Sequence, residues 1–233
     1  MKKWIIGLVV IIIVAIIAIM NYAPLKNKVM QQFFATKVYA LLNDDEVVNL
    51  HQVITKDSSN SRTVMWQSLN DRDDFILEYG TDEEGDLTTV SPQKSVLNID
   101  DKQIYIYSVY LNDLTPNTAY KYRVGYADSR TNWHDLKTAD KDNNNFKVLI
   151  FPDSQSNDYT DWKNVAMNAW QQNPDSNFFI NMGDLVDNGY DLSQWNAWFN
   201  SVEAMNTQIP VAPVQGNHEF YTTEWEVDLP IAY

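Results

Sequence analysis

The chain has 233 residues, of which 45% are hydrophobic and 13% aromatic, enough apolar material for one large or two modest folded domains. Its formal charge of −14, from 17 basic and 31 acidic residues, argues against a basic surface that binds nucleic acid or anionic lipid. It contains no cysteine, so disulfides, thiolate metal ligands and a cysteine nucleophile are excluded, and oxygen and imidazole groups remain as metal ligands.

An uninterrupted apolar run follows Lys2 and Lys3. Trp4–Met20 has no charged side chain and is at the short end of the length that crosses the ~30 Å hydrocarbon core of a bilayer. A cleaved signal peptide and a buried core helix are alternatives, but Ala18-Ile19-Met20 is a poor cleavage site. We therefore expect residues 1–23 to be a transmembrane signal anchor, with the N-terminal lysines inside and the bulk of the chain extracytoplasmic. If the segment is cleaved instead, the protein is secreted.

Residues 24–45 have apolar side chains at helical spacing. Pro24 suits the first turn of a helix. The apolar positions are Val29, Phe33, Phe34, Val38, Leu41 and Leu42. We expect a helical stalk here, which indicates no chemistry.

Residues 46–140 change to an apolar period of two, which predicts an all-β domain. Five runs are expected to be strands, separated by turns rich in Asp, Asn, Ser and Gly: Val47–Thr55, Thr63–Leu69, Asp74–Thr81, Gln103–Leu114 and Ala119–Ala127. The length and pattern resemble an immunoglobulin-like or fibronectin type III-like sandwich. We expect Trp66 and Tyr122 in its core, and we assign no role to His51 or His134.

A turn at Thr115-Pro116-Asn117 leads into a tyrosine at the start of an alternating strand. This arrangement resembles the tyrosine corner of immunoglobulin-like sandwiches, in which the phenol bonds to a nearby backbone group. Such sandwiches are mostly spacers or binding modules, so the domain alone indicates no reaction.

Residues 146–233 follow a polar linker, Lys137–Asn145, and alternate apolar runs with helical patterns. The expected strands are Phe146–Phe151, Asn177–Met182 and Ile209–Val214. One helix is expected to be capped by Thr160 or Asp161 and to end at Pro174, and a second to begin at Leu192 or Ser193. This β-α-β-α-β order predicts a parallel sheet with right-handed crossovers, half of an α/β domain.

Polar side chains follow each of the three expected parallel strands. Asp153 and Gln155 come after the first strand, Asp184 after the second, and Asn217 and His218 after the third. Ligands of parallel sheets gather beyond the carboxyl ends of the strands, so we expect these side chains to lie together. Carboxylate and amide oxygens suit a divalent cation, and the pattern predicts a metal site. The alternative is that Asp153 and Asp184 are ordinary turn residues.

The three motifs resemble the first three motifs of the calcineurin-like metallophosphoesterases. They are Asp153-x-Gln155, Gly183-Asp184-x-x-Asp187 and Gly216-Asn217-His218-Glu219. With a sandwich before them, the chain is similar to the purple acid phosphatase branch. The resemblance implies two metal ions (Fe, Mn or Zn) and the hydrolysis of a phosphate mono- or diester by in-line attack on phosphorus.

The resemblance also implies the metal ligands. Asp153 and Gln155 would hold the first ion, Asp184 would bridge the two ions, and Asn217 would bind the second. In the family, the position of Gln155 usually carries His, or Gly in the true purple enzymes, so this chain departs from the pattern there.

Two residues would act in catalysis by the same resemblance. His218 would stabilise charge or donate a proton near the leaving group, and Asp187 would orient His218. The later family motifs, Gly-His and Gly-His-x-His, do not occur before Tyr233. We therefore expect the chain to be the N-terminal part of a longer enzyme and nearly inactive alone.

Two other functions remain open from the sequence. One is a cell-surface binding protein that uses the sandwich and does not catalyse. The other is a metal-dependent nuclease, which the net charge of −14 disfavours. We expect a phosphate-ester substrate and the membrane as partners, and no nucleic acid. The oligomeric state is not predicted.

Overall fold

The computed structural model describes most of the chain after residue 46. The described residues are 47–99, 102–127, 129–142, 145–156 and 158–232. The expected anchor (1–23) and stalk (24–45) lie outside them. Within these described ranges, no helix is both long and apolar enough to cross a membrane.

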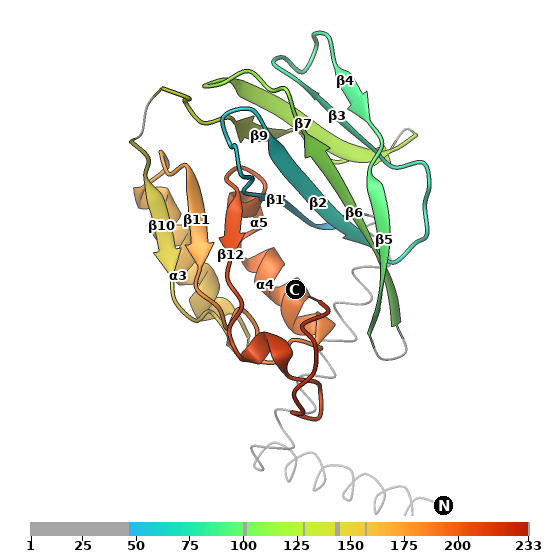
Figure 1. Ribbon diagram of the computed structural model, residues 1–233, viewed down its shortest axis with the longest axis vertical. Helices are drawn as coiled ribbons and strands as arrows, with labels where there is room; N and C mark the ends of the chain where they lie inside the picture. Colours follow the sequence, from blue (N-terminus) through green and yellow to red (C-terminus); the bar gives the residue numbers. More distant parts are fainter. Residues whose placement is uncertain (1–46, 100–101, 128, 143–144, 157, 233) are drawn as a thin grey trace, which may run out of the picture. The chain divides into compact units, whose positions relative to one another are not determined.

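The described part contains two sheets and a few helices (Figure 1). The strands are β1 (Val48–Val53), β2 (Arg62–Ser68), β3 (Ile76–Gly80), β4 (Thr88–Val90), β5 (Gln93–Ile99), β6 (Lys102–Leu111), β7 (Ala119–Tyr126), β8 (Ser129–Arg130), β9 (His134–Lys137), β10 (Val148–Phe151), β11 (Phe178–Asn181) and β12 (Val211–Pro213). The helices are α3 (Thr160–Gln172), α4 (Leu192–Ser201), α5 (Glu203–Asn206) and the 3-10 turn η1 (His218–Phe220).

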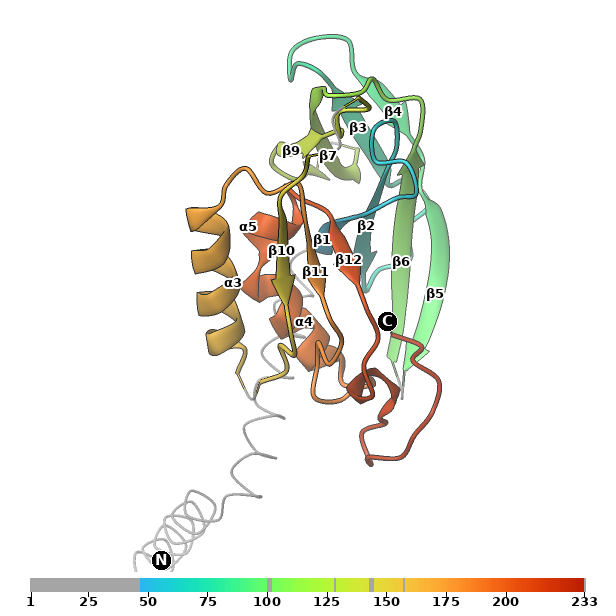
Figure 2. The same cartoon turned by 60° about the vertical axis from the view of Figure 1, so that its left-hand side comes forward.

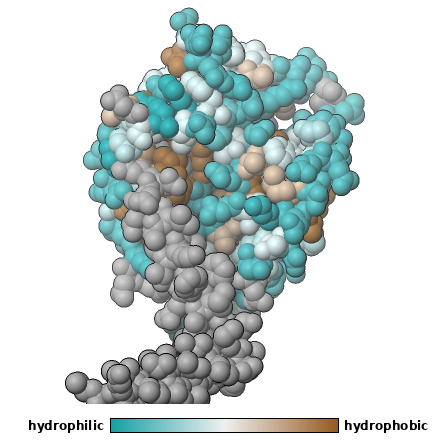
Figure 3. Space-filling model, turned by 180° about the vertical axis from the view of Figure 1, so that it is seen from behind, coloured by the Kyte–Doolittle hydropathy of each residue, from teal (hydrophilic) through white to brown (hydrophobic). Residues whose placement is uncertain are grey.

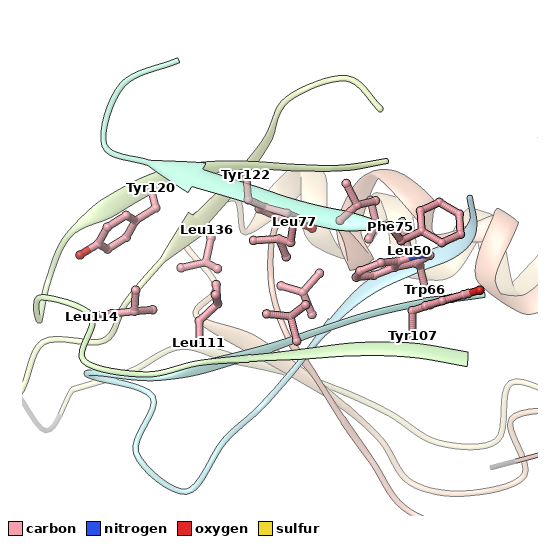
Figure 4. Close-up of a cluster of buried hydrophobic side chains, with 13 residues drawn as sticks. Leu50, Trp66, Phe75, Leu77, Tyr107, Leu111, Leu114, Tyr120, Tyr122 and Leu136 are labelled. Carbon is pink, nitrogen blue, oxygen red and sulfur yellow. The ribbon is translucent and has the colours of Figure 1, made fainter. Parts of the chain in front are cut away.

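The first half of the described chain is a β-sandwich, as expected. One layer contains β1, β2, β6 and β5, and the other has the order β4-β3-β7-β8, with β9 also paired to β7. Side chains from both layers meet between them (Figure 4). Trp66 and Tyr122 are fully buried there, which confirms their predicted place in the core. Trp66 stacks on Tyr107, with ring centroids 5.6 Å apart.

Tyr120 makes the predicted tyrosine corner. Its phenol oxygen accepts a hydrogen bond of 2.9 Å from the backbone N–H of Thr115. The bond closes the turn that leads into β7, so this expectation is confirmed.

The sandwich differs from the expectation in its strands, since β4, β5, β8 and β9 were not predicted and one predicted strand is shorter. β5 was missed because most of its side chains are exposed, so it lacks an apolar period of two. The strand expected to reach Leu114 ends at Leu111, because Asp113 has a positive φ of 58° and leaves the extended conformation. The N–H of Leu114 then bonds to the carbonyl of Asn60 at 2.9 Å.

The second half has the predicted β-α-β-α-β order. Strands β10, β11 and β12 are parallel and adjacent in chain order. Helices α3 and α4 pack on one face of these strands, as Figure 2 shows. The shared core contains Phe151, Phe179 and Val211 from the strands and Trp162 and Trp198 from the helices.

The opposite face of these strands carries apolar side chains that remain exposed. Phe146, Ile150 and Met182 are 65%, 55% and 57% exposed. Elsewhere, one face of the molecule is covered mainly by hydrophilic residues (Figure 3), in keeping with the net charge of −14.

The predicted cap of the first helix was wrong. α3 begins at Thr160, and its N-cap is Tyr159, which has a positive φ of 57° and gives no side-chain cap. The carboxylate of Asp158 instead accepts a bond of 3.0 Å from the N–H of Thr160. The second helix begins at Leu192, as expected, and Asp191 caps it.

The sequence did not predict that one sheet runs through both halves. β1 pairs in parallel with β12, which gives the order β10-β11-β12-β1-β2-β6-β5. The N–H of Ile54 donates to the carbonyl of Val211 at 3.0 Å. The sandwich is therefore joined to the α/β half by backbone pairing as well as by the linker.

Buried polar contacts add to this junction. The Tyr122 hydroxyl and the Gln52 side-chain amide both donate to the carbonyl of Thr207, at 2.9 and 2.8 Å. Asn49 donates to the side-chain oxygen of Asn196 at 2.6 Å. These buried groups link strands of the sandwich to α4 and to the turn after α5.

Candidate metal centre

The three polar motifs lie at the carboxyl ends of β10, β11 and β12, with η1 just beyond β12 (Figure 1). Because these strands are parallel neighbours, their ends share one edge of the sheet. The backbone N–H groups of Ser154 and Gln155 both donate to the carbonyl of Asp184 at 3.0 Å. The first and second motifs are therefore in direct contact.

Asp184 also contacts the third motif. Its Oδ1 accepts a bond of 3.0 Å from the backbone N–H of His218. Asp184 has a positive φ of 50°, and Gly183 before it has a φ of 95°. A Cβ at Gly216 would overlap Oδ1 of Asp184 and lie 2.5 Å from its backbone nitrogen, so only glycine fits there.

Glu219 holds these loops together, a role that the sequence did not reveal. Its side chain is 1% exposed. Oε1 accepts from the N–H of Leu185 at 2.7 Å, and Oε2 accepts from the N–H groups of Asp184 and Gly216 at 3.0 and 2.6 Å. The one signal for this role in the sequence is that Glu219 follows Gly216 by three residues. At this spacing a glutamate side chain can accept a hydrogen bond from the earlier backbone N–H.

Ser154 anchors the first loop to the helical layer. Its hydroxyl oxygen accepts from the indole N–H of Trp198 at 2.9 Å and from the amide of Asn181 at 2.8 Å. The hydroxyl donates to the carbonyl of Leu185 at 3.3 Å. The residue between the two proposed ligands Asp153 and Gln155 is thus fixed by buried partners.

His218 contacts Asp187, as the resemblance implied, but mainly through the backbone. The ring Nδ1 lies 2.7 Å from the carbonyl oxygen of Asp187 and 3.7 Å from its carboxylate. A carbonyl only accepts, so Nδ1 carries the hydrogen, and Nε2 is the acceptor in the neutral ring. Gln194 holds this loop through its side-chain oxygen, which accepts from the N–H of Asp187 at 2.8 Å.

The metal ligands expected from the sequence are only partly brought together. Asp184 joins the motifs, whereas Asp153 and Asn217 are exposed and, among the described residues, make no hydrogen bond to it. Asn217 uses its amide nitrogen to donate to the hydroxyl of Tyr221 at 3.3 Å. In the part of the chain that the structure describes, no group of three or more His, Asp or Glu side chains is placed to hold a metal ion.

One observation fits a cation beside Gln155. Its side-chain oxygen Oε1 is buried and has no hydrogen-bond donor within the described ranges. A buried acceptor without a partner costs roughly 1–3 kcal/mol, and a metal ion would satisfy it. The four candidate ligands supply two carboxylates and two amides, a donor set suited to a hard or borderline cation but weaker than one with imidazoles.

The two other histidines lie outside this site. His51 in β1 packs against Phe199, with ring centroids 4.8 Å apart, and its Nδ1 bonds to the carbonyl of Asn49 at 2.6 Å. Burial lowers the pKa of His51 to about 4. Burial also lowers the pKa of His134, which packs on Tyr122. His51 is buried and His134 is half-buried, and neither lies among the candidate metal ligands.

A cavity of about 330 Å³ also lies away from the strand ends. Its described lining includes Leu50, His134, Phe199 and Glu203, and none of the candidate metal ligands. This cavity is therefore separate from the candidate metal centre, which the motifs locate at the sheet edge.

A sandwich followed by parallel strands with these motifs defines a metallophosphoesterase-type architecture. Residues 128–231 match the sequence model of the family described as "Calcineurin-like phosphoesterase", and residues 47–138 match that of "Purple acid Phosphatase, N-terminal domain". These two matches confirm the resemblance to the calcineurin-like phosphoesterases and to their purple acid phosphatase-like branch.

Two solved structures share the fold. A purple acid phosphatase, PPD1, from yellow lupin (Lupinus luteus) seeds matches with a TM-score of 0.64 and 21% identity, over 75% of this chain and 36% of that one. PhoD matches with a TM-score of 0.52 and 14% identity, over 78% of this chain and 42% of that one. At these identities the likeness concerns the fold alone.

Among curated proteins, the chain is similar to "Probable inactive purple acid phosphatase 1" of Arabidopsis thaliana. The two are 30% identical over 135 residues, which cover 49% of this chain and 22% of the relative. The match thus spans less than a quarter of the relative's length.

Proposed function

We propose that this chain contributes part of a dinuclear metal centre that hydrolyses phosphate esters. The observation that carries the proposal is the position of Asp184. Its carbonyl accepts from the first motif and its carboxylate from the third, so one residue connects all three strand ends.

The candidate ligands divide between two ions. Asp153 and Gln155 would hold one ion, Asn217 the other, and Asp184 would bridge them. When bound, such ions activate water and neutralise the charge that develops on the phosphoryl group. The buried, unpartnered oxygen of Gln155 supports the first of these sites.

His218 would act on the leaving group. The Asp187 carbonyl holds its Nδ1, so the ring orientation is set before substrate binds. In the imidazolium form Nε2 would donate its proton to the departing oxygen and leave the ring neutral.

The test is metal binding and turnover by the full chain. We expect Mn²⁺ or Zn²⁺ to bind in calorimetry and any hydrolysis of p-nitrophenyl phosphate or its bis-ester to require metal. Asp184→Ala should abolish both, whereas Asp86→Ala, in an exposed loop, should change neither. Metal binding and turnover that persist in Asp184→Ala would overturn the proposal.

A second candidate function is binding without catalysis. The relative from Arabidopsis thaliana is named "Probable inactive purple acid phosphatase 1", which favours this alternative. In that case the metal-loaded protein, extended to the length of its relatives, would bind phosphate but turn over neither ester.

We also propose that residues 1–23 anchor the protein in a membrane and that the bulk of the chain is extracytoplasmic. The apolar run Trp4–Met20 behind two lysines supports this. The protein should remain in the membrane fraction after a high-salt wash. A soluble mature protein starting near Asn21 would show that the segment is a cleaved signal peptide.

A further inference from the structure

Two aromatic rings flank the imidazole of His218. The ring of Tyr221 lies 5.3 Å away and that of Trp225 lies 6.2 Å away, both nearly perpendicular to the imidazole. Tyr221 and Trp225 also contact each other at 5.7 Å. The rings of His218, Tyr221 and Trp225 therefore form a cluster in which each ring contacts the other two.

Trp225 is held in this cluster by a closed loop. Tyr221 forms a β-bridge with Val227, and the N–H of Trp225 donates to the carbonyl of Thr222 at 2.9 Å. The φ of Trp225 is 66°, a conformation that bulky residues rarely adopt. Backbone strain of this kind persists only where the surrounding contacts enforce it, and it is frequent at binding sites.

Burial does not explain the position of Trp225. Its side chain is 55% exposed, whereas Trp162, Trp195 and Trp198 in the same half of the chain are 4%, 6% and 1% exposed. A constrained and exposed indole presents a large flat surface at low entropic cost to a ligand.

Tyr221 connects this surface to the candidate metal centre. Its hydroxyl accepts from the amide of Asn217, a proposed metal ligand, at 3.3 Å. A phosphoryl group held at the strand ends would therefore have its ester substituent within reach of His218 and of the two rings.

We propose that Trp225 and Tyr221 form a stacking platform for the leaving group of an aryl phosphate ester. The platform determines specificity and rests on the proposed function, because it needs the phosphoryl group to bind at the strand ends. Stacking of one ring is expected to favour aryl over alkyl ligands about tenfold.

The experiment compares two phosphonates that differ only in their substituent. Phenylphosphonate and methylphosphonate are titrated calorimetrically into the Mn²⁺-loaded full chain. We expect phenylphosphonate to bind about tenfold more tightly. Trp225→Ala should bring the ratio close to one, because it weakens the binding of phenylphosphonate far more than that of methylphosphonate. Trp225→Phe should restore part of the ratio.

The matched control is Val227→Ala, on the same loop, whose side chain is 75% exposed. It should keep the parent ratio. A ratio that stays the same in Trp225→Ala, or a parent protein that does not distinguish the two ligands, would overturn the platform alone. If neither phosphonate binds to the metal-loaded parent, the proposed function fails and the platform fails with it.

Discussion

The carboxylate of Glu219 accepts a hydrogen bond of 3.0 Å from the backbone N–H of Asp184, 35 positions earlier in the chain. The same carboxylate accepts from the N–H of Leu185 and of Gly216. A residue that carries no proposed chemistry thus sets the geometry of the residue that would bridge two metal ions.

Glu219→Gln should destabilise the protein by about 2–4 kcal/mol, because the amide cannot accept all of these buried N–H groups. Urea unfolding measures the change. Glu224→Gln is the matched control, since Glu224 is exposed, and it should leave the midpoint unchanged. Equal midpoints for the two variants would contradict the structural role of Glu219.

Gly216→Ala should disrupt the metal centre more than the fold. The added methyl group would overlap Oδ1 of Asp184 and push this carboxylate from its place between the loops. We expect at least a tenfold loss of Mn²⁺ affinity in calorimetry. Gly85→Ala is the control, because its Cβ would have 3.2 Å to the nearest atom, in Asp82. An unchanged affinity in Gly216→Ala would show that Asp184 does not bind metal.

The stability of the protein should fall between pH 6.5 and pH 4 through His51. Burial lowers the pKa of this imidazole from 6.5 to about 4, so in this window the unfolded chain binds a proton that the folded chain excludes. The free energy of unfolding therefore decreases as the pH falls through the window, by about 2 kcal/mol at pH 5.

His51→Gln tests this pH dependence, because glutamine can still donate to the Asn49 carbonyl but does not titrate. Urea unfolding of both proteins at pH 7.5 and pH 5 should show the smaller loss in the variant. The titration of His134 and of the carboxylates is common to both proteins and cancels. An identical loss in both would show that His51 does not titrate on unfolding.

The Thr207 carbonyl allows a test of the junction between the two halves. Tyr122→Phe removes one of its two donors and should cost about 1 kcal/mol, since Gln52 still satisfies it. Tyr122→Phe with Gln52→Leu leaves the carbonyl unpaired and should cost more than the sum of the two single changes. Tyr110→Phe, at a side chain that is 62% exposed, is the control. If the loss of unfolding free energy in the double variant equals the sum of the two single losses, the two side chains do not share this acceptor.

The parts of the fold that follow from local pattern were predictable. Phe146–Phe151 is apolar apart from Lys147, which is the pattern of a parallel strand, and the polar residues after it fall at the sheet edge by topology alone. β5 escaped prediction because its face is solvated. The structural role of Glu219 escaped because a single glutamate in a sequence carries no sign of its burial.

The pairing of β1 with β12 could not be predicted from the sequence for another reason. It joins Val53 to Val211 across almost the whole described chain, and no local pattern records such a distant partner. The contact of His218 with Asp187 was predicted only in part. The motif indicates that the two residues meet, but it does not indicate that His218 bonds to the backbone carbonyl rather than chiefly to the carboxylate.

The shared sheet changes where this protein can be divided. The expected linker Lys137–Asn145 begins at the last residue of β9, and separating the chain further along it would leave β1 and β12 each with a row of unpaired backbone N–H and C=O groups. Such open edges recruit other strands, so isolated halves should associate with each other or aggregate. Proteolysis at this linker should therefore leave two fragments that migrate together until a denaturant separates them.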